Sequence, residues 1–261
     1  MGLLQLVLEV GAGRAYAREM RASFDFTGGV VIVTGGASGI GAALVRRAAD
    51  AGATVVVADV ADREGLALAA EDHAPGKIEF EHLDVTGQPA VRKCFDRIRA
   101  RHGRIDGLVC AAIIQPIGDV ADLQPNTWER VIAVNVSGAV WAAQAALPAM
   151  REQRSGSIVM FASGTADFGK AGSAPYTTSK GAVAAFARSL AREVAPWRIR
   201  VNLCRPGIVN TPMFQAANPG MDTSHLDGPE EPVGALMFLL SDAATMSGSI
   251  VTREMAWRAA A

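Results

Sequence analysis

The chain has 261 residues, of which 50% are hydrophobic and 20% charged, with 27 glycines and 12 prolines. These proportions are typical of a folded globular protein and exclude a disordered or collagen-like chain. With 25 basic and 26 acidic side chains the net charge is −1, so no overall positive field attracts nucleic acid or an anionic membrane surface. We therefore expect neither a nucleic-acid partner nor a membrane partner.

The segment before residue 24 carries no motif. Its first residues are apolar, but Glu9 interrupts them and no Lys or Arg precedes them, so a secretory signal is a poor match. We expect residues 1–23 to form an N-terminal extension, which is either a disordered or loosely docked arm or a stretch ahead of a true start at Met20. The apolar runs elsewhere are strand-sized, far short of the ~20 residues that span a bilayer.

Three cysteines, Cys94, Cys110 and Cys204, are widely spaced among apolar neighbours and form no CxxC pair. This usage suits reduced thiols in a core better than a disulfide or a zinc site, and it predicts a cytoplasmic protein. The four histidines, His73, His82, His102 and His225, are scattered and show no HxxxH or HExxH spacing, so no metal site is predicted.

From Val30 onward, short β-branched runs alternate with longer stretches of helical period. Strands are predicted at 30–34, 54–59, 78–84, 107–111, 157–161, 199–204 and 249–251. Helices are predicted around 40–48 and at 62–72, 88–102, 125–151, 175–195 and 229–240. This alternation predicts βαβ units, and so a single doubly wound α/β domain of Rossmann type over residues 24–261, with a seven-stranded parallel sheet and helices on both faces.

Directly after the first strand, residues 34–41 read TGGASGIG, and the crossover helix begins inside this stretch. Glycines let the backbone approach a pyrophosphate closely, while the N–H groups at the start of the helix attract its charge. Glycines in such a turn can also be purely conformational, so the prediction depends on their place between strand and helix. The predicted phosphate-binding residues are Gly35, Ser38, Gly39, Ile40 and Gly41.

Asp59 ends the second strand, eighteen positions beyond Gly41. A carboxylate at this place accepts hydrogen bonds from an adenosine ribose; the alternative is a solvated Asp at a strand end. Its charge would repel a 2′-phosphate, and neither Ser38 nor Val60 offers a cation to bind one, so NAD is predicted as cofactor rather than NADP. Arg63 weakens this inference unless it covers the helix surface or pairs with Asp59 or Asp62.

Tyr176 and Lys180, in the sequence YTTSK, stand four residues apart at the start of a predicted helix, so their side chains share one face. A tyrosine with a reference pKa of about 10 needs help to exchange a proton near neutral pH, and a nearby ammonium group stabilises the phenolate. Such a pair also occurs by chance on solvated helices, so by itself it is a weak motif.

Together, TGGASGIG and YTTSK resemble the short-chain dehydrogenase/reductase family, specifically its short single-domain branch. The resemblance covers roughly residues 24–251 and includes Asn135 in VNV and Ser163 after GSIVMFA. It implies that Tyr176 is the acid/base and that Ser163 hydrogen-bonds the substrate carbonyl or hydroxyl. It also implies that Lys180 holds the nicotinamide ribose and lowers the tyrosine pKa, and that Asn135 positions a water that extends the proton relay.

The resemblance implies further cofactor contacts. Asp84 and Val85, after the third strand, would flank the adenine. Within PGIVNTPM, which begins at Pro206 and Gly207, Ile208 and Thr211 would face the nicotinamide carboxamide. Each assignment has a simple structural alternative. Val85 and Ile208 would be core residues, Thr211 a turn residue, Asn135 an amide inside a helix and Ser163 a hydroxyl at a strand end.

Two stretches depart from the family pattern. Where the family has Asn-Asn-Ala-Gly after the fourth strand, this chain has Cys110, Ala111, Ala112 and Ile113. Ile113 adds bulk beside the cofactor and Cys110 offers only a weak donor, so the cofactor affinity or the loop geometry is expected to differ. The last strand is followed by residues 252–255, reading TREM, in place of Val-Asp-Gly-Gly, at a position where the family often builds a tetramer interface.

These features predict an oxidoreductase that transfers a hydride between NAD(H) and a small-molecule secondary alcohol or ketone. The family usually pairs subunits through the helices predicted at 125–151 and 175–195, so the resemblance implies a homodimer or homotetramer. Apolar residues between Thr211 and Pro229, such as Met213 and Phe214, suggest a substrate with hydrophobic surface or the ordinary packing of a short helix. The alternative function is a catalytically weak NAD-binding sensor or scaffold, suggested by the altered Cys110 to Ile113 stretch.

Overall fold

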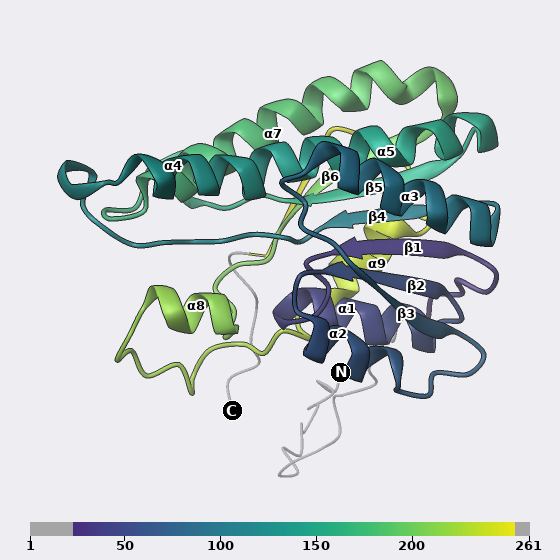
Figure 1. Cartoon of the computed structure of the whole chain (residues 1–261), viewed down its shortest axis with the longest axis horizontal. Coiled ribbons are helices and arrows are strands. Elements are labelled where there is room, and N and C mark those ends of the chain that lie inside the picture. Colours follow the sequence, from purple (N-terminus) through teal and green to yellow (C-terminus); the bar gives the residue numbers. More distant parts are fainter. Residues whose placement is uncertain (1–22, 254–261) are drawn as a thin grey trace, which may run out of the picture.

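The computed structural model describes residues 23–253 (Figure 1). Its centre is a parallel sheet with the strand order β3-β2-β1-β4-β5-β6-β7. The strands are β1 (Val30–Thr34), β2 (Thr54–Asp59), β3 (Lys77–His82), β4 (Gly107–Cys110), β5 (Gly156–Phe161), β6 (Ile199–Arg205) and β7 (Ile250–Thr252). The seven-stranded doubly wound fold is confirmed. The predicted N-terminal extension lies, except for Ser23, outside the described residues.

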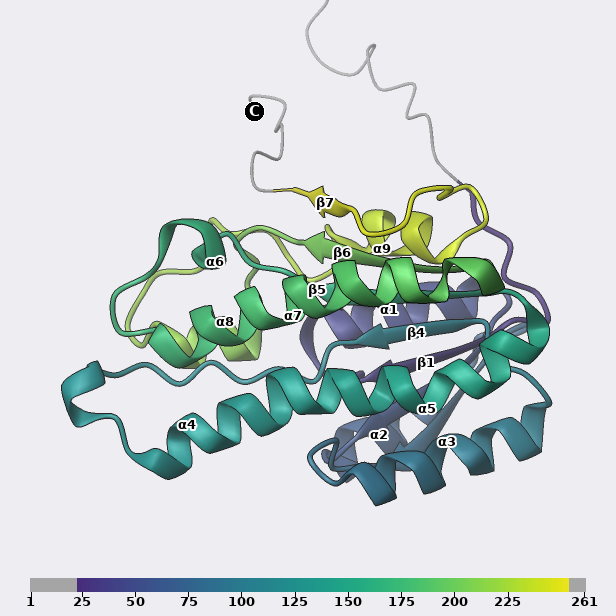
Figure 2. The same ribbon diagram turned by 90° about the horizontal axis from the view of Figure 1, so that it is seen from above.

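Helices cover both faces of the sheet (Figures 1 and 2). One layer contains α3 (Gln88–His102), α5 (Gly138–Gln153) and α7 (Ala174–Val194), and the other contains α1 (Gly39–Asp50), α2 (Asp62–Ala69) and α9 (Val233–Leu240). Because successive side chains of a strand point to opposite faces, Ile32 of β1 packs in the first layer and Val33 in the second, and both are fully buried. The continuous apolar runs of the strands follow from this double cover.

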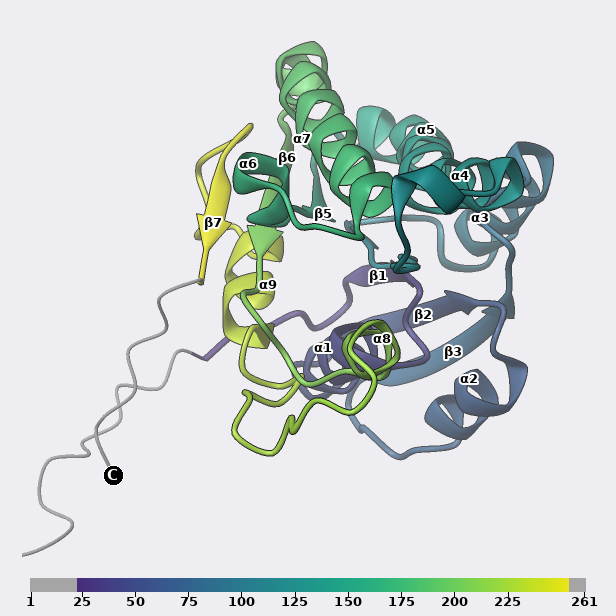
Figure 3. The same ribbon diagram turned by 90° about the vertical axis from the view of Figure 1, so that its left-hand side faces the viewer.

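The strand order reverses at β1, which pairs with β2 on one side and with β4 on the other. In open parallel sheets a crevice forms beyond the carboxyl ends of the strands at this point, and ligands bind there. Figure 3 looks onto these ends and shows α8 (Pro212–Ala217) in front of them, near α1. The fold therefore brings the glycine turn, the loop after β4 and the start of α7 to the same edge.

The helix predicted at 125–151 is divided into three parts. It consists of α4 (Pro125–Val131), a π-helical segment (Ile132–Ser137) and α5, which continues to Gln153. A π turn holds one residue more than an α turn and often occurs at functional sites. Hydrophobic periodicity does not reveal such a turn, because the apolar pattern continues through it.

One stretch of the described chain, Pro125–Gln153, is apolar and long enough to cross a membrane by length and composition alone. It is rich in alanine because α5 packs closely against both α3 and the sheet, and Ala142, Ala143 and Ala146 are fully buried. The core helix of a globular protein meets the same criterion. This helix is therefore weak evidence for a membrane partner, and the expectation of none stays a prediction.

Several element boundaries differ from the predicted ones. Helix α9 begins at Val233 rather than at 229, because Pro232 disfavours the helical conformation of the residue before it. Strand β3 ends at His82 rather than at 84. The short helices α6 (Thr165–Phe168) and α8, and the 3₁₀ turns η1 (Val120–Asp122) and η3 (Ala195–Trp197), were not predicted as elements.

Replacing one helical glycine by alanine should stabilise the fold, and replacing another should destabilise it. An added Cβ on Gly181 of α7 meets nothing within 4 Å, whereas one on Gly65 of α2 would lie 2.1 Å from Cδ2 of Phe80. Gly181→Ala should raise the free energy of unfolding by about 0.5–1 kcal/mol, and Gly65→Ala should lower it by roughly 1–3 kcal/mol through overpacking. Urea unfolding of both variants checks this, and equal shifts would contradict the packing described for α2.

Candidate active site

The glycine turn between β1 and α1 fits closely against the loop after β4. A Cβ added to Gly35 would lie 2.3 Å from the backbone nitrogen of Ala112, and one on Gly41 would lie 2.4 Å from the carbonyl oxygen of Gly35. Gly35 also has a φ of +69°, which favours glycine. Ser38, at the N-cap of α1, makes no side-chain capping hydrogen bond. The backbone of the glycine turn and the N-terminus of α1 thus border the crevice. This arrangement suits the binding of a phosphate group.

Asp59 ties the end of β2 to this turn. Its Oδ2 accepts a hydrogen bond from the Ala37 amide, and its Oδ1 accepts one from the Ala61 amide, both at 3.0 Å. Arg63 is exposed and pairs with Glu64 at 2.7 Å, so the suggested pairing of Arg63 with Asp59 or Asp62 is wrong. Asp59 therefore keeps a carboxylate at the place where an adenosine ribose is expected.

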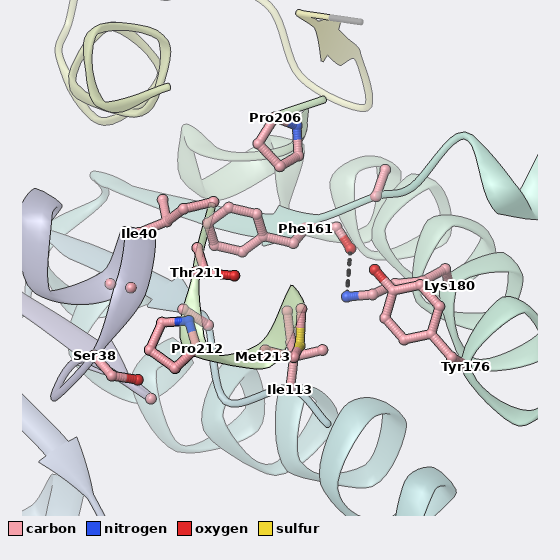
Figure 4. A pocket seen from close by; sticks show the side chains of 15 residues that line it. Ser38, Ile40, Ile113, Phe161, Tyr176, Lys180, Pro206, Thr211, Pro212 and Met213 are labelled. Carbon is pink, nitrogen blue, oxygen red and sulfur yellow. Dashed lines mark hydrogen bonds between the residues drawn. The ribbon is translucent and has the colours of Figure 1, made fainter. Parts of the chain in front are cut away.

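A pocket of about 120 Å³ connects the glycine turn with the start of α7 (Figure 4). Nine of the residues predicted from sequence line it: Gly35, Ser38, Gly39, Ile40, Gly41, Tyr176, Lys180, Pro206 and Thr211. Figure 4 shows Ser38 and Ile40 on one side and Tyr176 with Lys180 on the other. The sequence motifs of the cofactor and of the catalytic helix therefore meet at one cavity.

The pocket also has lining residues that were not predicted as site residues: Ala111, Ile113, Phe161, Ala162, Pro212 and Met213. They come from the ends of β4 and β5 and from the start of α8. The four residues at the strand ends could have been found from that position alone, whereas Pro212 and Met213 belong to the PGIVNTPM stretch.

The remaining predicted residues do not line this pocket. Val85 is buried and packs on Gly138, where an added Cβ would lie 2.6 Å from its Cγ2, so the core alternative describes it. Asp84 Oδ1 accepts hydrogen bonds from the Thr86 amide and hydroxyl at 3.0 and 2.8 Å. Ile208 is 63% exposed, so the core alternative is wrong for this residue, and Gly207 precedes it in the same loop.

Lys180 is almost completely buried, with 2% of its surface exposed. Its Nζ donates a hydrogen bond to the carbonyl oxygen of Phe161 at 3.1 Å and lies 5.4 Å from the centre of the Tyr176 ring (Figure 4). Because burial disfavours the charged form, the pKa of Lys180 falls to about 7. Burial therefore makes this lysine release its proton more easily than an exposed lysine does.

Tyr176 is buried beside it. Burial raises the pKa of Tyr176, and a hydrogen bond with Ser163 acts in the opposite direction. The predicted lowering of the tyrosine pKa by Lys180 is not found here, because the burial of Tyr176 outweighs the effect of the hydrogen bond. Ser163 also shares a hydrogen bond of 3.0 Å with the Thr165 hydroxyl. The hydroxyl groups of Ser163 and Tyr176 thus form a pair beside the pocket.

Asn135 lies in the π-helical segment and links two parts of the site by hydrogen bonds. Its Oδ1 accepts a hydrogen bond from the Ile114 amide at 2.8 Å, and its Nδ2 donates to Ile114 O at 2.9 Å and to Ser179 Oγ at 3.0 Å. Ser179 Oγ in turn donates to the Tyr176 carbonyl at 2.6 Å. Asn135 therefore fixes the loop after β4 and the start of α7, and its role in holding a water stays a prediction. Ser179, in YTTSK, was missed.

The departures from the family pattern are visible in the loop after β4. Cys110 is buried, its Sγ lies 4.0 Å from Ala139 O, and burial raises its thiol pKa to about 12. Cys94 and Cys204 are likewise buried and free. Ile113 lines the pocket and lies beside Met213 (Figure 4).

Within residues 23–253, no group of three His, Cys, Asp or Glu side chains is arranged to hold a metal ion.

Comparison with known proteins identifies the family. A family model described as short chain dehydrogenase matches residues 29–222. The chain belongs to this family. A short-chain type dehydrogenase/reductase from Mycobacterium marinum has a solved structure that superposes with a TM-score of 0.82 at 30% identity, covering 90% of this chain and 98% of that one.

Short-chain dehydrogenases with assigned substrates are also similar. A 3-oxoacyl-[acyl-carrier-protein] reductase from Thermotoga maritima is 32% identical over 234 residues, which are 86% of this chain and 95% of the relative. A cyclopentanol dehydrogenase from Comamonas is 38% identical over 187 residues, 71% of this chain and 75% of the relative. A 3-alpha-(or 20-beta)-hydroxysteroid dehydrogenase from Mycobacterium tuberculosis is 34% identical over 223 residues, 84% and 85% of the two chains. This short-chain dehydrogenase is therefore an oxidoreductase that uses a nicotinamide cofactor and acts on CH–OH groups.

Removal of the buried lysine charge should stabilise this short-chain dehydrogenase. Below pH 7 Lys180 is protonated in both the folded and the unfolded chain. The cost of burying its charge then lowers the free energy of unfolding by the full amount. Between pH 7 and about 10.5 the unfolded chain still binds it while the folded chain has released it, so stability rises with pH. Without cofactor, Lys180→Met should therefore raise the free energy of unfolding at pH 6 by more than about 1 kcal/mol, and the gain should shrink towards pH 10.

Urea unfolding at pH 6 and pH 9 provides the measurement. Lys93→Met, at an exposed position of α3, is the matched control and should show no such pH-dependent gain. A Lys180→Met protein that is less stable than wild type at pH 6 would contradict the penalty assigned to this buried charge.

Proposed function

We propose that this chain is an NAD-dependent oxidoreductase that interconverts a secondary alcohol and its ketone, with Tyr176 as the acid/base. The observation that carries the proposal is that Tyr176 and Lys180 line the same pocket as the glycine turn. Membership of the short-chain dehydrogenase family supports the reaction type. The names of two relatives, a cyclopentanol dehydrogenase and a hydroxysteroid dehydrogenase, support alcohols as substrates.

The residues present fit a dinucleotide. The pyrophosphate would lie against the glycine turn and the start of α1, where an added Cβ would collide with backbone. Asp59 would accept hydrogen bonds from the adenosine ribose, and Lys180 would donate to the nicotinamide ribose. Thr211 lines the pocket and would face the carboxamide. When bound, the nicotinamide ring supplies or takes the hydride.

Side chains of this protein transfer the proton. The Tyr176 hydroxyl donates its proton to the oxygen of a ketone, or accepts one from an alcohol, while the Ser163 hydroxyl hydrogen-bonds the same oxygen. Lys180, in its protonated form, would stabilise the phenolate that remains. Burial of these groups excludes water and strengthens each interaction with the developing alkoxide. Asn135 and Ser179 hold the helix start in place, so they act as positioning residues.

NAD is proposed over NADP because of Asp59. Its carboxylate faces the glycine turn through the Ala37 amide, and Arg63, a nearby cation, pairs with Glu64. A 2′-phosphate at this place would meet the negative charge of Asp59.

Assembly and location are proposed from the family resemblance and the cysteine usage. We propose a cytoplasmic homodimer or homotetramer in which α5 and α7 face the partner subunit. Trp141 and Phe186, on these helices, are partly buried and pack against the core of their own chain, which leaves part of each ring for a partner.

The rival function, an NAD-binding sensor or scaffold, predicts tight cofactor binding with no turnover. The altered loop after β4, in which Ile113 fills part of the pocket, is the observation in its favour. A panel of secondary alcohols with NAD, followed by the absorbance of the reduced nicotinamide, tests the two against each other. Turnover of any panel member excludes the rival.

Tyr176→Phe should lower kcat by roughly 10²-fold to 10⁴-fold, because the ring still packs but the transferable proton is lost. The dissociation constant for NADH should change little. Lys180→Met should lower kcat and also weaken NADH binding, since a ribose contact is removed. Steady-state kinetics and NADH fluorescence titration separate the two effects. Wild-type turnover by Tyr176→Phe would remove this tyrosine from the mechanism.

Asp59→Asn should shrink the preference for NADH over NADPH by about tenfold, equivalent to about 1.4 kcal/mol. The amide keeps an acceptor for the backbone but removes the charge that repels a 2′-phosphate. Asp62→Asn, at the exposed start of α2, is the matched control and should keep the wild-type ratio. Equal affinity of the wild-type protein for NADH and NADPH in fluorescence titration would overturn the proposed cofactor.

A further inference from the structure

Exposed apolar side chains concentrate around the entrance to the active site. Eight large hydrophobic residues are exposed in the described part of the chain, and four of them lie in α6 or in the loops that follow β4, β6 and α8. These four are Ile117, Phe168, Ile208 and Met221, with exposed fractions of 46%, 75%, 63% and 53%. Single exposed hydrophobic residues are ordinary, but a group of them beside a reactive pair of hydroxyls indicates a binding surface.

Phe168 and Ile208 lie on two segments that are joined beside Ser163. Helix α6 begins two residues after Ser163 and carries Phe168 at its end. Asp167 of this helix forms an ion pair with Arg205, the last residue of β6, and Ile208 follows three residues later. Figures 2 and 3 both show α6 next to the end of β6. Phe168 and Ile208 therefore belong to two segments that one ion pair joins close to Ser163.

Ile117 borders the site from the other side. The Gly118 amide donates to Gly172 O at 2.9 Å, and an added Cβ on Gly172 would lie 3.4 Å from Cγ2 of Ile117. Gly172 precedes α7, which carries Tyr176. Met221 follows α8, whose end is linked to the loop after α6 by a hydrogen bond of 3.2 Å from Lys170 Nζ to Asn218 Oδ1.

The interior of the pocket has the same chemical character as this entrance. Ile113, Phe161 and Met213 line it, and Lys180 is its one charged lining residue within the described chain. At the entrance, Arg205 is paired with Asp167, and Lys170 donates to Asn218. Arg130 lines the neighbouring pocket, which shares Ile113 and Met213 with this one, and it pairs with Asp84. A carboxylate or phosphate group that lay between Phe168 and Ile208 would lose its hydration against apolar surface.

We propose that the substrate of this enzyme is an uncharged secondary alcohol, or its ketone, with a bulky apolar body, and that Phe168 and Ile208 determine this specificity. The inference rests on the proposed oxidoreductase function. The carbinol carbon must lie within reach of Tyr176 and Ser163, so the rest of the molecule extends outward between α6 and the loop after β6. Burial of hydrocarbon against Phe168 and Ile208 then supplies the binding energy. Ile208 thereby binds substrate instead of the nicotinamide carboxamide implied by the family resemblance.

The first experiment compares three alcohols that differ at one position: cyclohexanol, 4-tert-butylcyclohexanol and 4-hydroxycyclohexanecarboxylate. With saturating NAD, the tert-butyl compound should have a kcat/KM at least about tenfold above that of cyclohexanol, because its added carbon atoms are removed from water. The carboxylate should have a lower kcat/KM than cyclohexanol. A carboxylate preferred to the tert-butyl compound would overturn the proposal.

Substitutions at the entrance test the two residues directly. Phe168→Ser and Ile208→Ser should each reduce the ratio of kcat/KM between 4-tert-butylcyclohexanol and cyclohexanol by about threefold to tenfold, mainly through KM of the larger alcohol. Leu66→Ser is the matched control, since Leu66 is 60% exposed on α2 and outside the entrance, and it should keep the wild-type ratio. An unchanged ratio in both entrance variants would overturn the proposal.

A binding measurement without turnover separates this proposal from the proposed function. Tyr176→Phe with NADH bound is titrated calorimetrically with 4-tert-butylcyclohexanone, with and without Phe168→Ser. Weaker ketone binding in the double variant supports the entrance site even when no alcohol is oxidised, a result that would defeat only the proposed function. If the wild-type protein oxidises an alcohol, and Tyr176→Phe binds the ketone equally well with and without Phe168→Ser, the proposed entrance site is overturned and the proposed function is not. A lower solution mass of Phe168→Ser with unchanged ketone affinity would make this surface an interface between copies and overturn the proposal.

Discussion

The site depends on a contact between two pieces of backbone. Gly35 touches the loop after β4 so closely that a single Cβ would collide with Ala112. Because of this contact, the turn at the end of β1 and the loop at the end of β4 form one continuous wall at the point where the strand order reverses. Asp59, at the end of β2, connects a third strand to this wall by accepting a hydrogen bond from the Ala37 amide. The edge of the sheet is therefore rigid where a dinucleotide has to be held.

The catalytic side of the pocket is fixed by a second set of contacts. Asn135 holds Ile114 with two hydrogen bonds and reaches α7 through Ser179. The wider π turn places this amide inside the helix layer, where it is buried and hydrogen-bonded to protein groups. The loop after β4 is thus held from both ends, by the glycine turn and by Asn135. Tyr176 and Lys180 gain their fixed orientation from the same framework.

Most of the fold could be predicted from the sequence because buried parallel strands and amphipathic helices leave strong periodic signals. The glycine turn, Tyr176 and Lys180 could be predicted because their chemistry requires particular residue types at a fixed spacing. The π-helical segment could not, since an extra residue in one turn changes no hydrophobic pattern. The burial of Val85 against Gly138 and the exposure of Ile208 depend on contacts between distant segments. The direction of the Tyr176 pKa shift likewise depends on how deeply Tyr176 itself is buried, which spacing alone does not determine.

The burial of Lys180 has a thermodynamic consequence for ligand binding. Burial lowers the pKa of this lysine from 10.5 to about 7, so the group exchanges its proton near neutral pH. Any ligand that offers a hydrogen-bond acceptor to Nζ favours the ammonium form and therefore takes up protons from the buffer as it binds. The heat of binding then includes the ionisation enthalpy of the buffer and differs between phosphate and Tris solutions at the same pH. The lysine thereby couples the occupancy of the pocket to the proton concentration of the surroundings.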